Sequence, residues 1–169
     1  MRKATFNFEG ENVLVIGGSR GIGKRVCELF IHFKAKNVYS IARTSCDLKL
    51  VKNIICDISD TDELLSSLKD IREDIDILVN VAGTNLCEPI DFIDYDEWDR
   101  VISVNLKSFF TTIKCISPGM IRRKGGKIVN VSSIAGRSKS IVSGAHYTSS
   151  KYGIIGLTKQ MAQERWSSS

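Results

Sequence analysis

Three glycines, Gly17, Gly21 and Gly23, follow a run of four apolar residues at positions 13–16. Because glycine has no Cβ, the chain can turn tightly there and its backbone can approach a phosphate closely. A helix that starts near Gly21 would point unpaired N–H groups and its positive dipole end at the same anion. The pattern predicts a pyrophosphate-binding turn. Its spacing, Gly-x-x-x-Gly-x-Gly, differs from the commoner Gly-x-Gly-x-x-Gly, so a glycine-rich connection without a ligand is the alternative.

A tyrosine and a lysine four residues apart, Tyr147 and Lys151, form the second chemically suggestive pair. On a helix, residues at this spacing lie on one face. A phenol with an ordinary pKa of about 10 is a poor acid–base group at neutral pH, but a neighbouring ammonium favours the phenolate. The pair could therefore transfer a proton. The alternative is a tyrosine at the start of a helix whose hydroxyl faces water.

The elements that would position these residues alternate between strand and helix. Short apolar runs predict strands at residues 13–16, 37–43, 54–56, 77–79 and 127–132. Apolar residues at three- and four-residue spacing predict helices from residue 21 onward and at residues 61–73, 95–123 and 146–165. This alternation specifies an α/β fold with a parallel sheet and right-handed crossovers. The 169 residues are expected to form one domain, with Phe6 and Phe8 packing onto its edge.

Composition and charge favour a small-molecule ligand over nucleic acid. The net charge is +5, from 24 basic and 19 acidic side chains, but the basic residues are scattered and have no interleaved aromatic residues. No apolar run approaches membrane-spanning length and no signal peptide follows Met1, so we expect no membrane association and a cytoplasmic location. Five scattered cysteines without CxxC spacing indicate reduced thiols, and no metal site is expected.

Further motifs stand at the ends of the expected strands. Asn80-Val81-Ala82-Gly83 ends the fourth strand, Asn105 lies inside the long helix, Ser132-Ser133 ends the fifth strand, and Tyr147-Thr-Ser-Ser-Lys151 opens the last helix. Together with the glycine turn, and in this order, they resemble the short-chain dehydrogenase/reductase family over residues 10–164. The resemblance implies a Rossmann-type three-layer α/β/α fold, with strand order 3-2-1-4-5, that binds NAD(P) over residues 1–169.

The resemblance also implies catalytic roles. Tyr147 would give a proton to a carbonyl oxygen or take one from an alcohol, and Lys151 would also bond the ribose hydroxyls beside the nicotinamide. Asn105 would anchor a water that links Lys151 to solvent; its alternative role is to bond the backbone of a neighbouring strand. Ser133 would hold the substrate oxygen. Ser132 is the competing serine, and only one of the two can face the ligand because successive strand residues point to opposite sides.

Cofactor choice depends on the end of the second strand. An acidic residue there would bond a 2′-hydroxyl and repel a 2′-phosphate, but Ala42 and Arg43 occupy these positions. Arg43 and Arg20 therefore favour NADP(H), with NAD(H) less favoured and two solvated arginines as the alternative. By resemblance Asp57 would bond the adenine amine, and the segment from Asn80 would line the cofactor or brace the sheet. The expected cofactor-binding set is Gly17, Ser19, Arg20, Gly21, Ile22, Gly23, Arg43, Asp57, Ile58, Asn80, Ala82, Gly83, Tyr147 and Lys151.

The expected activity is hydride transfer between NADP(H) and a carbonyl or secondary alcohol, with a 3-oxoacyl thioester among the expected substrates. Sugars, steroids and small ketones stay open. Members of the family continue through further strands, so we expect a chain truncated after Glu164. The alternative function is an inactive nucleotide-binding fragment, or a subunit that pairs with a full-length relative. A complete fold would form a homo-oligomer through the long helix and the last helix.

Overall fold

The described part of the chain, residues 6–166 of this computed structural model, is built around a five-stranded parallel sheet. Its strands are β1 (Asn12–Ile16), β2 (Asn37–Ala42), β3 (Val51–Ile55), β4 (Ile77–Asn80) and β5 (Lys127–Asn130). Their order, β3-β2-β1-β4-β5, confirms the expected fold class and strand order. The expectations about a signal peptide at Met1 and about the chain end at residues 167–169 concern positions outside the described residues.

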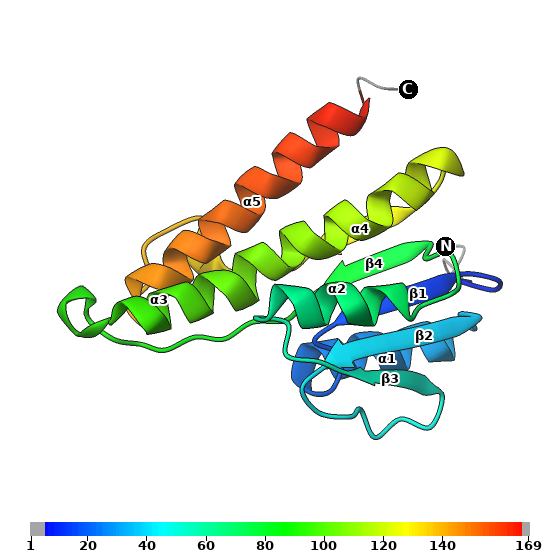
Figure 1. Ribbon diagram of the computed structural model, residues 1–169, viewed down its shortest axis with the longest axis horizontal. Helices are drawn as coiled ribbons and strands as arrows, with labels where there is room; N and C mark the ends of the chain where they lie inside the picture. The colour runs from blue at the N-terminus through cyan, green and yellow to red at the C-terminus, as the bar shows by residue number, and fades with distance from the viewer. Residues whose placement is uncertain (1–5, 167–169) are drawn as a thin grey trace, which may run out of the picture.

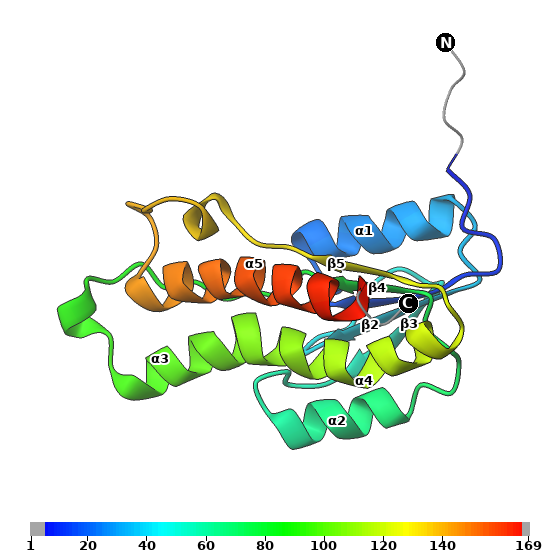
Figure 2. The ribbon, with the colours of Figure 1, turned by 90° about the horizontal axis from the view of Figure 1, so that it is seen from above.

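Helices cover both faces of the sheet and make three layers (Figure 1, Figure 2). They are α1 (Gly21–His32), α2 (Thr61–Lys69), α3 (Tyr95–Ile102), α4 (Ser108–Arg122) and α5 (Ala145–Trp166), with 3-10 turns at Ile90–Phe92 and Ile134–Gly136. Val13 and Val15 of β1 belong to the core on the α1 side, together with Cys27. Leu14 and Ile16 belong to the core under α2, α4 and α5. Because successive strand residues point to opposite faces, a strand covered on both faces is apolar throughout.

The expected long helix over residues 95–123 is present, but its centre is not α-helical. Residues Ser103–Lys107 form a π-helical turn between α3 and α4, and Asn105 lies within it, fully buried. Such turns are rare and occur often at functional sites. The sequence spacing could not show this turn, because the side chain of Asn105 bonds the backbone of Thr84, which is distant along the chain. Elsewhere β3 begins at Val51 rather than residue 54, and α2 ends at Lys69 rather than residue 73.

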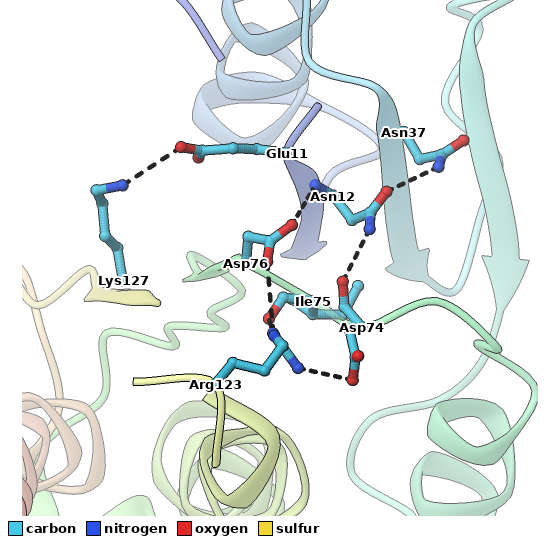
Figure 3. Close-up of polar contacts among 8 residues, drawn as sticks. All are labelled: Glu11, Asn12, Asn37, Asp74, Ile75, Asp76, Arg123 and Lys127. Atoms are coloured by element: carbon cyan, nitrogen blue, oxygen red, sulfur yellow. Dashed lines mark hydrogen bonds and ion pairs between the residues drawn. The ribbon is translucent and has the colours of Figure 1, made fainter. Parts of the chain in front are cut away.

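A polar cluster fastens the amino ends of the strands (Figure 3). Arg123, at the end of α4, donates to the carbonyl oxygen of Ile75 at 2.8 Å and pairs with the Asp74 carboxylate at 2.6 Å. The side chain of Asn12 donates to the Asp74 carbonyl oxygen, and its backbone N–H donates to the Asp76 carboxylate, each at 2.9 Å. These bonds join β1, α4 and the segment before β4, so the amino end of the sheet is held firmly.

The lead-in residues pack on the domain edge as expected. The ring centroids of Phe8 and Phe30 are 4.8 Å apart, and those of Phe6 and Phe33 are 5.7 Å apart. Both pairs meet edge to face, an arrangement that aromatic rings favour. The lead-in therefore extends the core around the last turn of α1.

The five cysteines are free thiols. Cys27, Cys46 and Cys56 are buried, in agreement with their interpretation as small apolar residues, whereas Cys87 and Cys115 are exposed. Burial raises the pKa of the Cys27 thiol to about 12, which keeps it neutral in the core. Across residues 6–166, no helix has the length and apolar character needed to cross a membrane. The same residues contain no group of three or more His, Cys, Asp or Glu side chains placed to hold a metal ion.

Candidate active site

A cavity of about 570 Å³ is lined by residues that follow the carboxyl ends of the strands. In Figure 1 these strand ends point toward α3 and the start of α5. Cofactor pockets commonly have this size. Of the expected cofactor-binding set, the residues that line it are Gly17, Ser19, Arg20, Gly21, Ile22, Gly23, Arg43, Asp57, Ile58, Ala82 and Gly83. They come from four separate segments of the sequence, which the parallel sheet brings to one edge.

Two glycines of the turn occupy positions that no side chain could fill. Gly17 has a φ of +92°, and a Cβ there would lie 2.7 Å from the Cα of Ala82. A Cβ on Gly23 would overlap the carbonyl oxygen of Gly17. The first turn of α1 therefore packs directly on the end of β1, which brings backbone N–H groups to the cavity.

The start of α1 differs from the starts of α2 and α3. Asp60 caps α2 by accepting from the backbone N–H groups of Asp62 and Glu63, and Asp94 caps α3 by accepting from Glu97. At α1 the N-cap residue is Arg20, which makes no side-chain cap, and the first turn contains no acidic residue. Unpaired N–H groups and an adjacent cation suit a bound phosphate. The turn therefore fits the pyrophosphate of a dinucleotide.

Charged side chains of both signs line the cavity. Arg20, at the start of α1, and Arg43, directly after β2, both line it. Asp57 lines it after β3, and the backbone N–H and hydroxyl of Ser59 donate to its carboxylate at 3.0 and 2.7 Å. These bonds, with weaker help from Arg43 and Arg100, hold the pKa of Asp57 below its ordinary value. Asp57 is therefore ionised at neutral pH and able to accept a hydrogen bond.

Lys151 and Tyr147, the pair singled out by its four-residue spacing, adjoin this cavity next to Gly83. A Cβ on Gly83 would lie 3.5 Å from the Lys151 Nζ and 3.7 Å from the Asn105 Oδ1. The Lys151 Nζ lies 5.5 Å from the centroid of the Tyr147 ring and donates to the carbonyl oxygen of Val131 at 3.2 Å. The structure thus brings Tyr147, Lys151 and Asn105 to one edge of the cavity.

The side chain of Asn105 is hydrogen-bonded to two other segments of the chain. Its Oδ1 accepts from the backbone N–H of Thr84 at 2.8 Å, and its Nδ2 donates to the Thr84 carbonyl oxygen at 2.9 Å. The same Nδ2 also lies 3.1 Å from the Ser150 hydroxyl on α5. These bonds correspond to the alternative role considered for Asn105, that of bonding a neighbouring backbone. They fix Thr84, which lines the cavity, against α5.

The two serines after β5 are bonded differently. The Ser132 hydroxyl donates to the carbonyl oxygen of Lys151 at 2.8 Å, so its proton is used inside the fold. The Ser133 oxygen accepts from the backbone N–H of Ala135 at 3.2 Å and caps the 3-10 turn that follows. Among the described residues, the Ser133 proton has no acceptor. Ser133 therefore still has a proton with which to hold a substrate oxygen.

A family model described as short chain dehydrogenase matches residues 11–168 of this chain. The chain belongs to the short-chain dehydrogenase family. The 3-oxoacyl-[acyl-carrier-protein] reductase FabG of Vibrio harveyi is 31% identical over 169 residues, which cover 94% of this chain and 68% of the relative.

Two solved structures extend the comparison. A 3-oxoacyl-[acyl-carrier protein] reductase from Brucella melitensis with bound NAD has a TM-score of 0.87 and 33% identity, over 95% of this chain and 68% of that one. A metagenomic short-chain oxidoreductase in complex with NADP has a TM-score of 0.86 and 31% identity, over 93% of this chain and 76% of that one. The protein is an NAD(P)-dependent short-chain oxidoreductase, and its cofactor is a nicotinamide dinucleotide.

One expected cofactor residue lies deeper than the cavity wall of this short-chain dehydrogenase. Asn80 is fully buried; its Nδ2 donates to the Asn130 Oδ1 at 2.9 Å, and its Oδ1 accepts from the Thr112 hydroxyl at 2.9 Å. These bonds join β4 to β5 and α4, which corresponds to the bracing role considered for it.

Sequence analysis missed several wall residues: Ile41, Thr44, Cys56, Val81, Thr84, Arg100 and Val104. Thr44 had a usable signal, since it follows Arg43, and its hydroxyl lies 3.2 Å from that of Ser19. Arg100 and Val104 are four residues apart on the segment that leads into Asn105, so they share a helix face. Nothing in their types indicated that this face turns toward the cavity.

The buried lysine gives this short-chain dehydrogenase a pH-dependent stability. Burial lowers the pKa of Lys151 from 10.5 to about 8, so between these pH values the unfolded chain binds more protons and stability rises with pH. We expect Lys151→Met to be more stable than the parent by about 2 kcal/mol at neutral pH, because it buries no charge.

That advantage should shrink as the pH rises from 8 to 10.5, where the parent gains stability and the variant does not. Urea unfolding of both proteins across this range measures the difference. An advantage that stays constant with pH would contradict the assignment of the cost to the buried ammonium.

Proposed function

We propose that this short-chain dehydrogenase transfers a hydride between NADP(H) and a carbonyl or secondary alcohol, with Tyr147 as the acid–base group. The proposal rests on one juxtaposition: Lys151 and Asn105 lie against Gly83, which also lines the cavity that fits a dinucleotide. NADP(H) supplies the hydride when it is bound. The chain's own residues supply position and the proton.

Each catalytic side chain has a task in this proposal. Tyr147 gives its phenolic proton to the substrate carbonyl oxygen in reduction and takes the alcohol proton in oxidation. Lys151, with its Nζ 5.5 Å from the ring centroid of Tyr147, offers a positive charge to the phenolate and donors to the ribose hydroxyls. Ser133 donates to the substrate oxygen, and Asn105, bonded to Thr84 and Ser150, holds the segment after β4 beside Lys151.

The preference for NADP(H) rests on Arg20 and Arg43, which both line the cavity. We expect Arg20→Ala and Arg43→Ala each to weaken NADPH binding about 10- to 100-fold, since each removes a charge-assisted contact to the 2′-phosphate. NADH, which lacks that phosphate, should bind the Arg43 variant as it binds the parent. Arg20→Ala also removes the cation at the start of α1, beside the proposed pyrophosphate site, so it should weaken NADH binding as well. Titration followed by nicotinamide fluorescence measures the four affinities.

Arg25→Ala is the matched control, because Arg25 lies on α1 but is exposed and paired with Glu28 at 2.6 Å. It should leave both affinities unchanged. Equal losses of NADPH and NADH binding in the Arg43 variant would mean that this arginine does not read the 2′-phosphate, and the NADP(H) preference would be wrong.

The substrate class is proposed from the relatives, two of which are named as 3-oxoacyl-[acyl-carrier-protein] reductases. NADPH oxidation in the presence of acetoacetyl-coenzyme A, a soluble 3-oxoacyl thioester, is the direct test. Turnover of the thioester well above that of small ketones and sugars supports it. NADPH binding without turnover of any carbonyl would instead support the inactive nucleotide-binding fragment.

Self-association belongs to the same proposal. Phe110 and Ile121 of α4 and Tyr152 of α5 have exposed fractions of 47%, 41% and 47%, and the two helices run side by side (Figure 1, Figure 2). Exposed apolar side chains on neighbouring helices are a feature of interfaces. We expect sedimentation velocity at micromolar concentration to show a dimer or larger species, and Phe110→Glu to shift it to the monomer. A monomeric parent would contradict the proposal.

A further inference from the structure

His146 immediately precedes Tyr147 in the first turn of α5, and its side chain is fully buried. Both ring nitrogens have partners. Nε2 lies 2.7 Å from the Glu97 Oε1 on α3, and Nδ1 lies 2.8 Å from the backbone nitrogen of Tyr147. A buried polar ring with both nitrogens bonded is a fixed part of the fold.

The partners determine which ring nitrogen carries the proton. A backbone N–H can only donate, so the Nδ1 of His146 must be the acceptor from Tyr147 and carries no proton. The proton is then on Nε2, which donates to the Glu97 carboxylate. A neutral imidazole therefore bridges a carboxylate on α3 to the main chain of the tyrosine.

Glu97 is itself held in place. Its backbone N–H donates to the Asp94 carboxylate at 2.7 Å, which caps the start of α3. The same segment continues into the π-helical turn that carries Asn105. The pair Glu97–His146 thus ties the first turn of α5 to the helical segment that carries Asn105.

The loop before α5 closes around the imidazole. A Cβ on Gly144 would lie 2.5 Å from the His146 Cε1 and 3.0 Å from the carbonyl oxygen of Leu86. The Gly144 N–H donates to that same carbonyl oxygen at 3.2 Å. Packing against Gly144 and hydrogen bonds at both nitrogens hold the imidazole in a single orientation.

We infer that His146 is a positioning residue: held by Glu97, it fixes the main chain of Tyr147 and so the direction of the phenol. The inference rests on the proposed function of Tyr147. It goes beyond that function because neither His146 nor Glu97 lines the cavity or contacts the Tyr147 hydroxyl. An error of about 1 Å in such a group can cost about a hundredfold in rate.

The test compares three variants that separate the two bonds of the imidazole. His146→Asn keeps an acceptor near the Nδ1 position and loses the bond to Glu97. His146→Gln keeps a donor near the Nε2 position and loses the bond to Tyr147, and Glu97→Gln keeps an acceptor for Nε2–H without the charge. His32→Ala is the matched control, since it removes the exposed imidazole at the end of α1.

We expect His146→Asn and His146→Gln to lower kcat about 10- to 100-fold while KM for NADPH stays within about twofold, because binding and chemistry use different residues. Glu97→Gln should retain most of the parent's kcat, since its amide oxygen can still accept the hydrogen bond from the Nε2–H of His146. His32→Ala should match the parent. A parent-like kcat in both His146 variants, or a loss carried by KM for NADPH alone, would overturn the positioning role.

Amide hydrogen exchange of the protein without cofactor gives a second measure that does not depend on turnover. The Tyr147 amide should exchange at least about tenfold faster in His146→Gln than in the parent, because its acceptor is gone. Amides of α1 should be unchanged. An unchanged Tyr147 amide would overturn the inference, whereas a parent that protects this amide but reduces no carbonyl would instead overturn the proposed function.

Discussion

Tyr147→Phe is expected to lower kcat by about 10²- to 10⁴-fold, the usual contribution of a positioned proton donor. The ring keeps its place beside Lys151, so the change removes the hydroxyl and little else. Tyr147 is half-buried and does not line the part of the cavity that holds the glycine turn. The Kd for NADPH should therefore stay within about twofold of the parent value. Steady-state kinetics with acetoacetyl-coenzyme A and a fluorescence titration with NADPH measure the two quantities.

Tyr152→Phe provides the control for this loss. Tyr152 lies on the same helix and is 47% exposed. It is five residues beyond Tyr147, so the two side chains leave α5 on different faces. Its hydroxyl should be dispensable for turnover. Rapid turnover by Tyr147→Phe would show that another group supplies the proton. An inactive parent that still binds NADPH would favour the nucleotide-binding fragment.

The parts of the site that could be predicted from the sequence are those that depend on patterns of neighbouring residues. The apolar run before Gly17 and the glycine spacing predicted a strand, a turn and a helix start, and all three are present. Arg43 was assigned to the cavity because it follows the second strand, and parallel strands end at one edge of their sheet. Such features depend on a few neighbouring residues and the topology of the fold.

The parts that sequence could not supply depend on contacts between distant segments. The π-helical turn exists where Asn105 bonds Thr84, 21 residues earlier in the chain. The partner of His146 is Glu97, 49 residues earlier, and no local pattern distinguishes this histidine from an exposed one. Burial and pairing of a single polar residue are decided by the tertiary packing, so they become visible only when the helices are placed.

The starts of α1, α2 and α3 are capped differently. Asp60 and Asp94 neutralise the starts of α2 and α3 from within, whereas Arg20 leaves the start of α1 open to the cavity. A helix start without a side-chain cap is less stable: replacing an N-cap residue by alanine typically lowers the free energy of unfolding by about 1 kcal/mol. The proposed binding of a pyrophosphate at this turn gives a reason for the missing cap, since a side-chain cap would occupy the N–H groups that the anion needs.

The largest effect on cofactor binding is expected from Gly23→Ala. The added Cβ would overlap the carbonyl oxygen of Gly17, a backbone atom that cannot rotate away. Relief requires α1 to move from the end of β1, which withdraws its first N–H groups from the phosphate. We expect NADPH and NADH binding both to weaken by more than about a hundredfold, with a stability loss of about 1–3 kcal/mol from the forced shift.

Gly156→Ala is the matched control for this substitution. Gly156 lies in α5, and a Cβ there would meet nothing within 4 Å, so the change should raise helix stability by about 0.5–1 kcal/mol and leave binding unchanged. Far-UV circular dichroism and urea unfolding establish that the Gly23 variant is folded when its affinity is measured. Parent-like NADPH binding by that variant would refute the pyrophosphate turn. Because this variant should lose both dinucleotides, whereas Arg43→Ala should lose only NADPH, the two substitutions separate binding of the shared pyrophosphate from recognition of the 2′-phosphate.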